Sequence, residues 1–133
     1  MITLKQILEL RTGEIISYEG GEALEKVREN GYNLRFVHKQ TPEICLEAVN
    51  EDGDALKYVK EQTPEICLAA VKQYGNALQF VREQTPEICL AAVKEEEDAL
   101  QSVDKSIFKE EKTMITLELT EEQIEQVKKI INN

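Results

Sequence analysis

The stretch QTPEICLAAVK occurs twice, at residues 62–72 and 84–94, and the near copy QTPEICLEAVN begins at Gln40. The period is 22 residues. The units are 40–61, 62–83 and 84–105, and residues 18–39 form a degenerate copy. Repetition at a fixed interval indicates one structural unit stacked on copies of itself. This constraint limits the fold to a linear array of similar elements.

Each unit begins with signals for a helix. Thr41 is a suitable N-cap, Pro42 fits the first helical position, and Glu43 complements the positive end of the helix dipole. The apolar residues that follow recur at helical spacing, and they are Ile44, Cys45, Ala48 and Val49. The pattern predicts a helix of about ten residues with one apolar stripe.

A second, shorter helix is expected in each unit. Gly53 and Gly75 stand where the first helix ends, and we expect them to adopt a left-handed turn. The next residues, Asp54, Asn76 and Asp98, are expected to cap the second helix. Neither helix can bury its apolar stripe alone. The prediction is therefore a mainly α fold, an α-solenoid of short helix pairs.

The last unit departs from the pattern, since Glu97 replaces the glycine and Ser102 replaces an aromatic residue. Terminal units are expected to be atypical because one face has no neighbour. The array is expected at residues 18–105, between an N-terminal cap at 1–17 and a C-terminal strand-helix appendage at 106–133.

The appendage has its own pattern. Ile115, Leu117 and Leu119 alternate with polar residues as a short strand would. Thr120 and Gln123 form a capping box before an apolar stripe, which predicts a helix.

The N-terminal segment has two interpretations. Leu4, Ile7 and Leu8 fit one face of a helix that caps the stack, which we prefer. Alternatively, MITLKQ forms a strand and pairs with the similar MITLEL at Met114. Either terminal segment could instead supply a dimer contact.

The units QTPEICLAAVKQYGNALQFVRE resemble a family of unknown function whose tandem units have the general form TPEICLAAVKQNGYALQYVKEQ. The resemblance covers residues 18–105. Such units occur in bacterial and bacteriophage proteins, and the family has no established catalytic residues. The resemblance implies helical repeats and a phage or bacterial setting.

The acidic charge is concentrated in the repeats. The chain has 133 residues and a formal net charge of −10. Residues 40–105 hold six basic and fourteen acidic side chains. Such a surface repels nucleic-acid phosphates and attracts a basic protein surface, although acid that only maintains solubility is an equal alternative. Without an apolar run long enough for a membrane span or signal peptide, we expect a cytoplasmic protein.

We expect no metal, cofactor or catalytic site. Cys45, Cys67 and Cys89 occupy one position in successive units, so their spacing suits neither a disulfide nor a zinc site. We expect them to be small buried residues. His38 is the only histidine, and the sequence shows no phosphate-binding loop or serine nucleophile motif. The chain is therefore not expected to be an enzyme.

Two sets of residues are candidates for binding a partner. The acidic set combines a row of first-turn glutamates with the densest acidic run, and it comprises Glu43, Glu65, Glu87, Glu95, Glu96, Glu97 and Asp98. The alternative is an ordinary solvated helix face. The aromatic set is Tyr58 and Phe80, in register with Phe36; packing between units is the rival explanation.

We therefore expect a non-catalytic protein-binding module. A concrete version is a phage-encoded inhibitor, such as an anti-CRISPR protein, that blocks a basic nucleic-acid-binding partner. The alternative is a structural repeat protein that associates into a homodimer.

Overall fold

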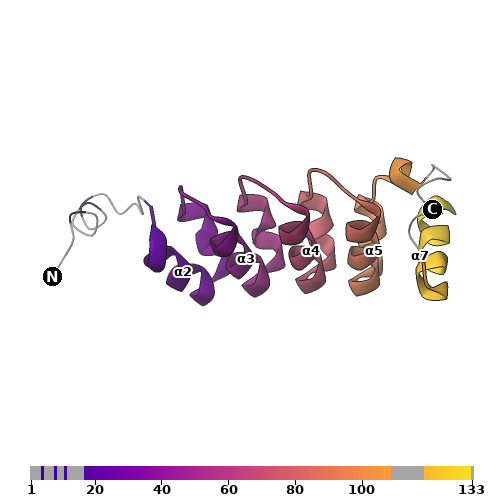
Figure 1. The fold of residues 1–133 in the computed structure, drawn as a ribbon, viewed down its shortest axis with the longest axis horizontal. Coiled ribbons are helices and arrows are strands. Elements are labelled where there is room, and N and C mark those ends of the chain that lie inside the picture. Colours follow the sequence, from indigo (N-terminus) through magenta and orange to yellow (C-terminus); the bar gives the residue numbers. More distant parts are fainter. Residues whose placement is uncertain (1–3, 5–7, 9–10, 12–16, 109–118, 133) are drawn as a thin grey trace.

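A computed structural model describes Leu4, Leu8, Arg11 and residues 17–108 and 119–132. The units stack in a single row (Figure 1), and each pairs an α-helix with a short 3-10 helix. The α-helices are α2 (Gly20–Glu29), α3 (Pro42–Glu51), α4 (Pro64–Gln73) and α5 (Pro86–Glu95). Their 3-10 partners are η1 (Gly31–Phe36), η2 (Gly53–Tyr58), η3 (Gly75–Phe80) and η4 (Glu97–Ser102). The predicted helical stack is confirmed.

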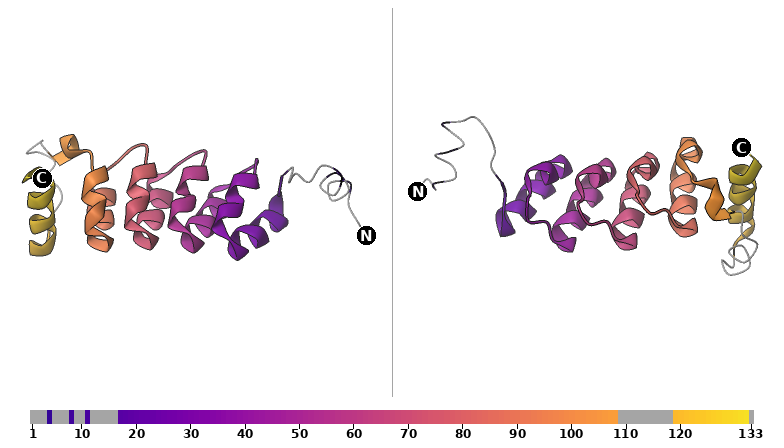
Figure 2. Two further views of the ribbon diagram at one scale, coloured as in Figure 1. Left: turned by 180° about the vertical axis from the view of Figure 1, so that it is seen from behind. Right: turned by 90° about the horizontal axis from the view of Figure 1, so that it is seen from above.

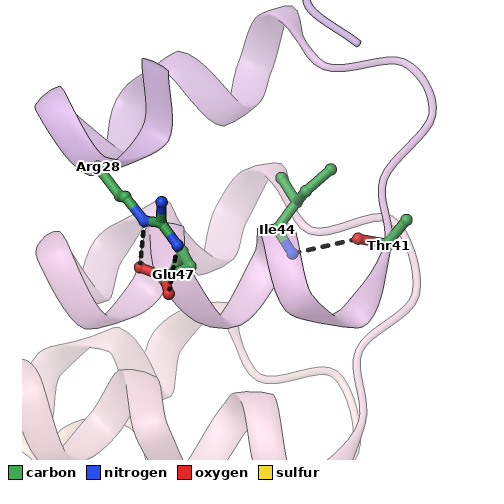
Figure 3. A network of polar contacts seen from close by, with 4 residues as sticks. All are labelled: Arg28, Thr41, Ile44 and Glu47. Carbon is green, nitrogen blue, oxygen red and sulfur yellow. Dashed lines mark hydrogen bonds and ion pairs between the residues drawn. The ribbon is translucent and has the colours of Figure 1, made fainter. Parts of the chain in front are cut away.

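The predicted start of the α-helices is also confirmed. The Thr41 hydroxyl accepts a hydrogen bond of 3.2 Å from the Ile44 amide (Figure 3). Thr63 and Thr85 make the equivalent bond in the next two units. The proline after each threonine occupies the first helical turn, where the missing amide hydrogen costs nothing.

The predicted left-handed turn is wrong. Among the described glycines, only Gly20 has a positive φ. Gly53 instead lies against the next unit, where an added Cβ would sit 2.5 Å from the Ala70 carbonyl oxygen. An added Cβ would likewise overlap the Ala48 carbonyl oxygen at Gly31 and the Ala92 carbonyl oxygen at Gly75. Glycine is therefore required because the second helix of one unit touches the backbone of the following unit.

The exception in the last unit follows from the same geometry. Glu97 occupies the glycine position of the fourth unit, after which no further unit of this pattern follows. No following α-helix backbone then needs to approach this position, so a side chain is accommodated, and it is exposed to solvent. Its carboxylate contacts Lys129 at 3.2 Å.

The predicted caps of the second helices are wrong as well. Each 3-10 helix begins two residues earlier than expected, so Asp54, Asn76 and Asp98 lie inside its first turn. Two of these side chains bind neighbouring units instead. Asp54 accepts a 2.6 Å hydrogen bond from the Tyr32 hydroxyl, and Asn76 donates one of 2.6 Å to Glu96.

One apolar core runs the length of the stack, and the cysteines belong to it. Cys45, Cys67 and Cys89 are at most 3% exposed and form no disulfide. The other buried residues of this core are mainly alanines, valines, isoleucines and leucines. The prediction that they are small buried residues is confirmed.

The first unit has a polar outer face. In α3, the side that faces the preceding unit carries Ile44 and Ala48, which are 3% and 0% exposed. The same register positions in α2 are Glu22, which is exposed, and Lys26, which is half-buried. Because charged residues replace the apolar contact, the array ends at α2 without needing a further unit.

The N-terminal segment is described at three residues only. Leu4, Leu8 and Arg11 are helical, in agreement with the preferred interpretation. Leu4 is 74% exposed, so its side chain does not cover the stack. The other residues of MITLKQ lie outside the described residues.

At the other end, helix α7 (Glu121–Asn132) packs against α5 and the short η5 (Lys105–Phe108). It buries Val127 and Ile130, and the predicted capping box is present between Thr120 and Gln123. The predicted strand is not supported: Leu119 lies in no strand, Ile115 and Leu117 fall outside the described residues, and the described part contains only helices. None of the described helices could cross a membrane.

The glycine contacts predict a position-specific effect of a methyl group. We expect Gly53→Ala to lower the free energy of unfolding by about 1–3 kcal/mol, because the new Cβ overlaps the Ala70 carbonyl. Chemical denaturation monitored by circular dichroism measures this change.

The matched control is Gly21→Ala in α2, where a Cβ meets nothing within 4 Å. This change is expected to leave stability unchanged or to raise it by up to about 1 kcal/mol, since alanine favours a helix over glycine. Equal effects at the two positions would contradict the close approach between units.

Candidate functional site

The loops between units form one edge of the stack, visible at the top of Figure 1, and glutamine side chains hold it together. The Gln40 amide donates a 2.8 Å hydrogen bond to the Tyr58 carbonyl and accepts one of 2.9 Å from the Lys60 amide. Gln62 and Gln84 repeat both bonds. We call residues 38–41, 60–63 and 82–85 the loop edge; the glutamines pair the backbone amides of Lys60 and Arg82 in it.

Basic side chains on the loop edge are also engaged. The Lys60 ammonium donates to the His38 carbonyl at 2.7 Å. At the equivalent position of the next unit, the Arg82 guanidinium donates to the carbonyls of Lys60 and Val59 at 2.8 and 3.0 Å. These cations therefore join consecutive loops of the stack.

The opposite edge is acidic. We call residues 29–32, 51–54, 73–76 and 95–98 the turn edge, because they connect each α-helix to its 3-10 helix. The turn edge holds eight acidic and no basic side chains, whereas the loop edge holds two acidic and three basic ones. The seen-from-behind view in Figure 2 shows the helices of every unit spanning between these two edges. Of these two sets of residues, only the turn edge carries a net negative charge.

The structure separates the predicted acidic residues into two groups. Glu95, Glu96, Glu97 and Asp98 lie on the turn edge, and all except the half-buried Glu96 are exposed. Glu43, Glu65 and Glu87 are exposed in the first turns of their α-helices, at the other end of each unit. A ten-residue α-helix is about 15 Å long, so the two groups do not form one surface. Sequence reasoning missed Glu51, Asp52 and Asp54, which the 22-residue register places on the same edge, two units before the predicted run.

One acidic residue of the α-helices, Glu47, pairs with a cation of the preceding unit. Arg28 of α2 faces Glu47 of α3 with nitrogen–oxygen distances of 3.3 and 3.4 Å (Figure 3). The hydrogen bond and the charge of Glu47 raise the pKa of the Arg28 guanidinium. This ion pair links the first two units and reduces the acidity of that helix face.

Glu87 also lines a groove. The groove has a volume of about 650 Å³ and lies between α4, α5 and the start of α7. Its floor includes Leu68, Leu90 and Leu119, and Lys72 and Lys94 lie along it. The charges around the groove are mixed, so it does not extend the acidic turn edge.

The predicted aromatic residues surround a cation that sequence reasoning missed. Tyr58 and Phe80 are half-buried against the core, and the Lys57 ammonium lies 5.2 and 5.8 Å from their ring centroids. The Tyr32 ring is 5.5 Å from the same ammonium. Phe36, the third ring of the predicted row, contacts Tyr18 and the Arg35 guanidinium. The rings therefore combine inter-unit packing with cation contacts.

Tyr32 connects this cluster to the turn edge. Its hydroxyl donates to the Asp54 carboxylate at 2.6 Å, and this bond together with burial raises the pKa of Tyr32 to about 12. The phenol therefore stays protonated at neutral pH and keeps its proton for this hydrogen bond.

The described residues contain neither a metal-binding cluster nor a disulfide. They contain no group of three His, Cys, Asp or Glu side chains placed to hold an ion. Burial raises the pKa of the Cys45 thiol to about 11 and that of Cys89 to about 12, and it raises the pKa of Cys67. Each thiol donates to the glutamine of its own unit at 3.3–3.5 Å. The thiols are consequently poor nucleophiles.

The comparison with known families agrees with the repeat geometry. The model of a domain of unknown function, DUF4116, matches at residues 23–63, 42–85 and 63–109, so the overlapping matches cover more than half of the chain. The chain belongs to the DUF4116 family. No curated protein and no solved structure shows significant similarity to it. In this DUF4116 protein, successive matches begin about one repeat apart, as expected for a tandem array.

The buried thiols predict a pH dependence of stability. Unfolded cysteines titrate near 9.0, whereas the folded pKa values are higher. Above pH 9 the unfolded state loses thiol protons that the folded state keeps, so the free energy of unfolding falls as pH rises toward 12.

We expect this fall to be smaller in the double variant Cys45→Ala, Cys89→Ala. The measurement is urea denaturation of both proteins between pH 7 and 11. A constant stability difference across this range would show that the thiols do not contribute.

Proposed function

We propose that this DUF4116 protein is a non-catalytic binding module whose acidic turn edge recognises a basic protein surface. The observation that carries the proposal is the composition of the turn edge: eight acidic and no basic side chains lie in the four turns. On the turn edge, Asp52, Asp54 and Glu96 accept hydrogen bonds from within the stack. Glu51, Glu95 and Asp98 on the same edge are exposed to solvent. Complementary charge of this kind accelerates association and orients the partner.

The stack supports such a role by holding the carboxylates in fixed positions. The acid is concentrated in the second and fourth turns, and the third turn between them is polar and uncharged, with Gln73, Tyr74 and Asn76. Adjacent helices pack about 8–10 Å apart, so the two acidic turns lie on the order of 20 Å from each other. A partner with two basic clusters at that separation fits this edge.

A charge-reversal pair tests the proposed surface. The first variant carries Glu51→Lys, Glu95→Lys and Asp98→Lys; the second carries Glu43→Lys, Glu65→Lys and Glu87→Lys. Both raise the formal net charge from −10 to about −4. Binding of a fluorescent peptide of eight Arg-Gly repeats is measured by anisotropy at 50 mM salt.

We expect the turn-edge variant to lose at least about tenfold in affinity and the first-turn variant to lose far less, because only the first removes clustered charge. Equal losses would show that total charge alone governs binding. A larger loss in the first-turn variant would assign the site to the other edge.

The inhibitor version of this function is a phage-encoded cytoplasmic protein that occupies a basic nucleic-acid channel, as an anti-CRISPR protein would. It predicts that the chain reduces DNA cleavage by a purified CRISPR effector from a bacterial host of such a phage, and that the turn-edge variant restores cleavage. Undiminished cleavage at saturating concentrations contradicts this version for that effector.

Homodimer formation is the second candidate, and exposed apolar residues on α7 favour it. Ile124 and Ile131 are 39% and 46% exposed and lie seven residues apart, on one side of the helix. Light scattering at micromolar concentration distinguishes the candidates, since a dimer would have twice the mass of the 15.2 kDa chain. A monomer at all concentrations eliminates this alternative.

A further inference from the structure

Three aromatic rings from three consecutive units converge on one ammonium group. The Lys57 Nζ atom lies 5.5 Å from the ring centroid of Tyr32 in η1, 5.2 Å from that of Tyr58 in η2 and 5.8 Å from that of Phe80 in η3. We call these three rings the aromatic cage. Such a convergence exists only because the 22-residue repeat brings side chains of separate units together.

The cage supplies the electrostatic contacts of this cation. The face of an aromatic ring is negative, so a cation within about 6 Å of several ring centroids is attracted by each of them. In the described part of the chain, the Lys57 ammonium forms no ion pair with a carboxylate. The contacts recorded for this ammonium among the described residues are therefore those with the three rings.

The walls of the cage are more firmly held than its occupant. Tyr58 and Phe80 pack against the continuous core, and Tyr32 is fixed by the hydrogen bond from its hydroxyl to Asp54. Lys57 is exposed and reaches the rings through a flexible four-carbon chain. Movement of Lys57 into solvent would leave the three rings in place.

The same register position shows that a cation here is not needed to build a unit. The position equivalent to Lys57 holds Arg35 in the first unit, and the Arg35 guanidinium lies 4.5 Å from the Phe36 ring centroid. In the third and fourth units the same position holds the uncharged Gln79 and Gln101. Units with and without a cation have the same helices. Lys57 is therefore an occupant of the cage and not a requirement of the fold.

We propose that the aromatic cage is a binding site for alkylated ammonium groups, and that Lys57 occupies it until such a ligand displaces it. Methylated ammonium groups suit the site because they are less strongly hydrated than a primary ammonium and still carry the charge that the rings attract. The shared chemistry is a quaternary ammonium, present in trimethyl-lysine of a protein and in small amines such as choline. This inference does not depend on the proposed function of the turn edge.

Two substitutions at one exposed position test the site in the full chain. Lys57→Ala empties the cage, whereas Lys57→Arg refills it with another cation. The aromatic proton resonances of each protein are followed by NMR during titration with tetramethylammonium chloride, with sodium chloride as the ionic-strength control.

We expect Lys57→Ala to bind tetramethylammonium about tenfold more tightly than the wild type, and Lys57→Arg to bind no more tightly than the wild type. Adding Phe80→Leu to Lys57→Ala should abolish the gain, because one wall is lost while apolar packing is kept. Circular dichroism confirms that each variant is folded. Equal binding by the Ala and Arg variants, or no shift of the ring resonances, would overturn the proposal.

The source of the ligand is distinguished with the Lys57→Ala protein. A peptide that contains trimethyl-lysine and free choline are titrated separately. Tighter binding of the peptide assigns the site to a methylated protein partner, and tighter binding of choline assigns it to a small amine. Failure of both would contradict the site even if the turn edge binds basic peptides.

Discussion

The structure depends on the close approach of each 3-10 helix to the backbone of the next unit. Gly31, Gly53 and Gly75 make this approach possible, since a Cβ at any of them would lie 2.4–2.5 Å from a carbonyl oxygen. The approach fixes the spacing between units, and on the loop edge the Lys60 and Arg82 side chains tie each unit to carbonyl groups of the preceding one. Side chains 22 residues apart then meet, as Tyr32 and Asp54 do.

The sequence was sufficient to predict the stack because its signals are local and repeated. The threonine cap, the proline and the apolar stripe of each α-helix act within ten residues, and the structure confirms them at Thr41, Thr63 and Thr85. The role of Gly53 was not predictable in this way. Its constraint comes from Ala70 in another unit, whereas a glycine after a helix more commonly indicates a left-handed turn.

The candidate surfaces were likewise predictable only where they follow from the repeat itself. Periodicity placed Glu43, Glu65 and Glu87 in one row, but it did not show that Glu95 to Asp98 lie at the opposite end of the helices. The cage was missed because its members, Tyr32, Tyr58 and Phe80, occupy two different register positions, and its occupant Lys57 has glutamine as its counterpart in two units. The stack pairs polar groups internally on the loop edge and leaves exposed carboxylates on the turn edge, and the proposed recognition of a basic partner rests on those carboxylates.

Deletion of one complete unit tests the central claim most directly. Removing Gln62 to Glu83 joins Glu61 to Gln84, and Gly53 then meets the Ala92 carbonyl where it met that of Ala70. If the units are interchangeable stacked elements, the shortened chain will retain its helical circular dichroism per residue and unfold cooperatively at a lower temperature. A shortened chain that has lost its helical signal at 20 °C would show that the units are not equivalent and would contradict the account.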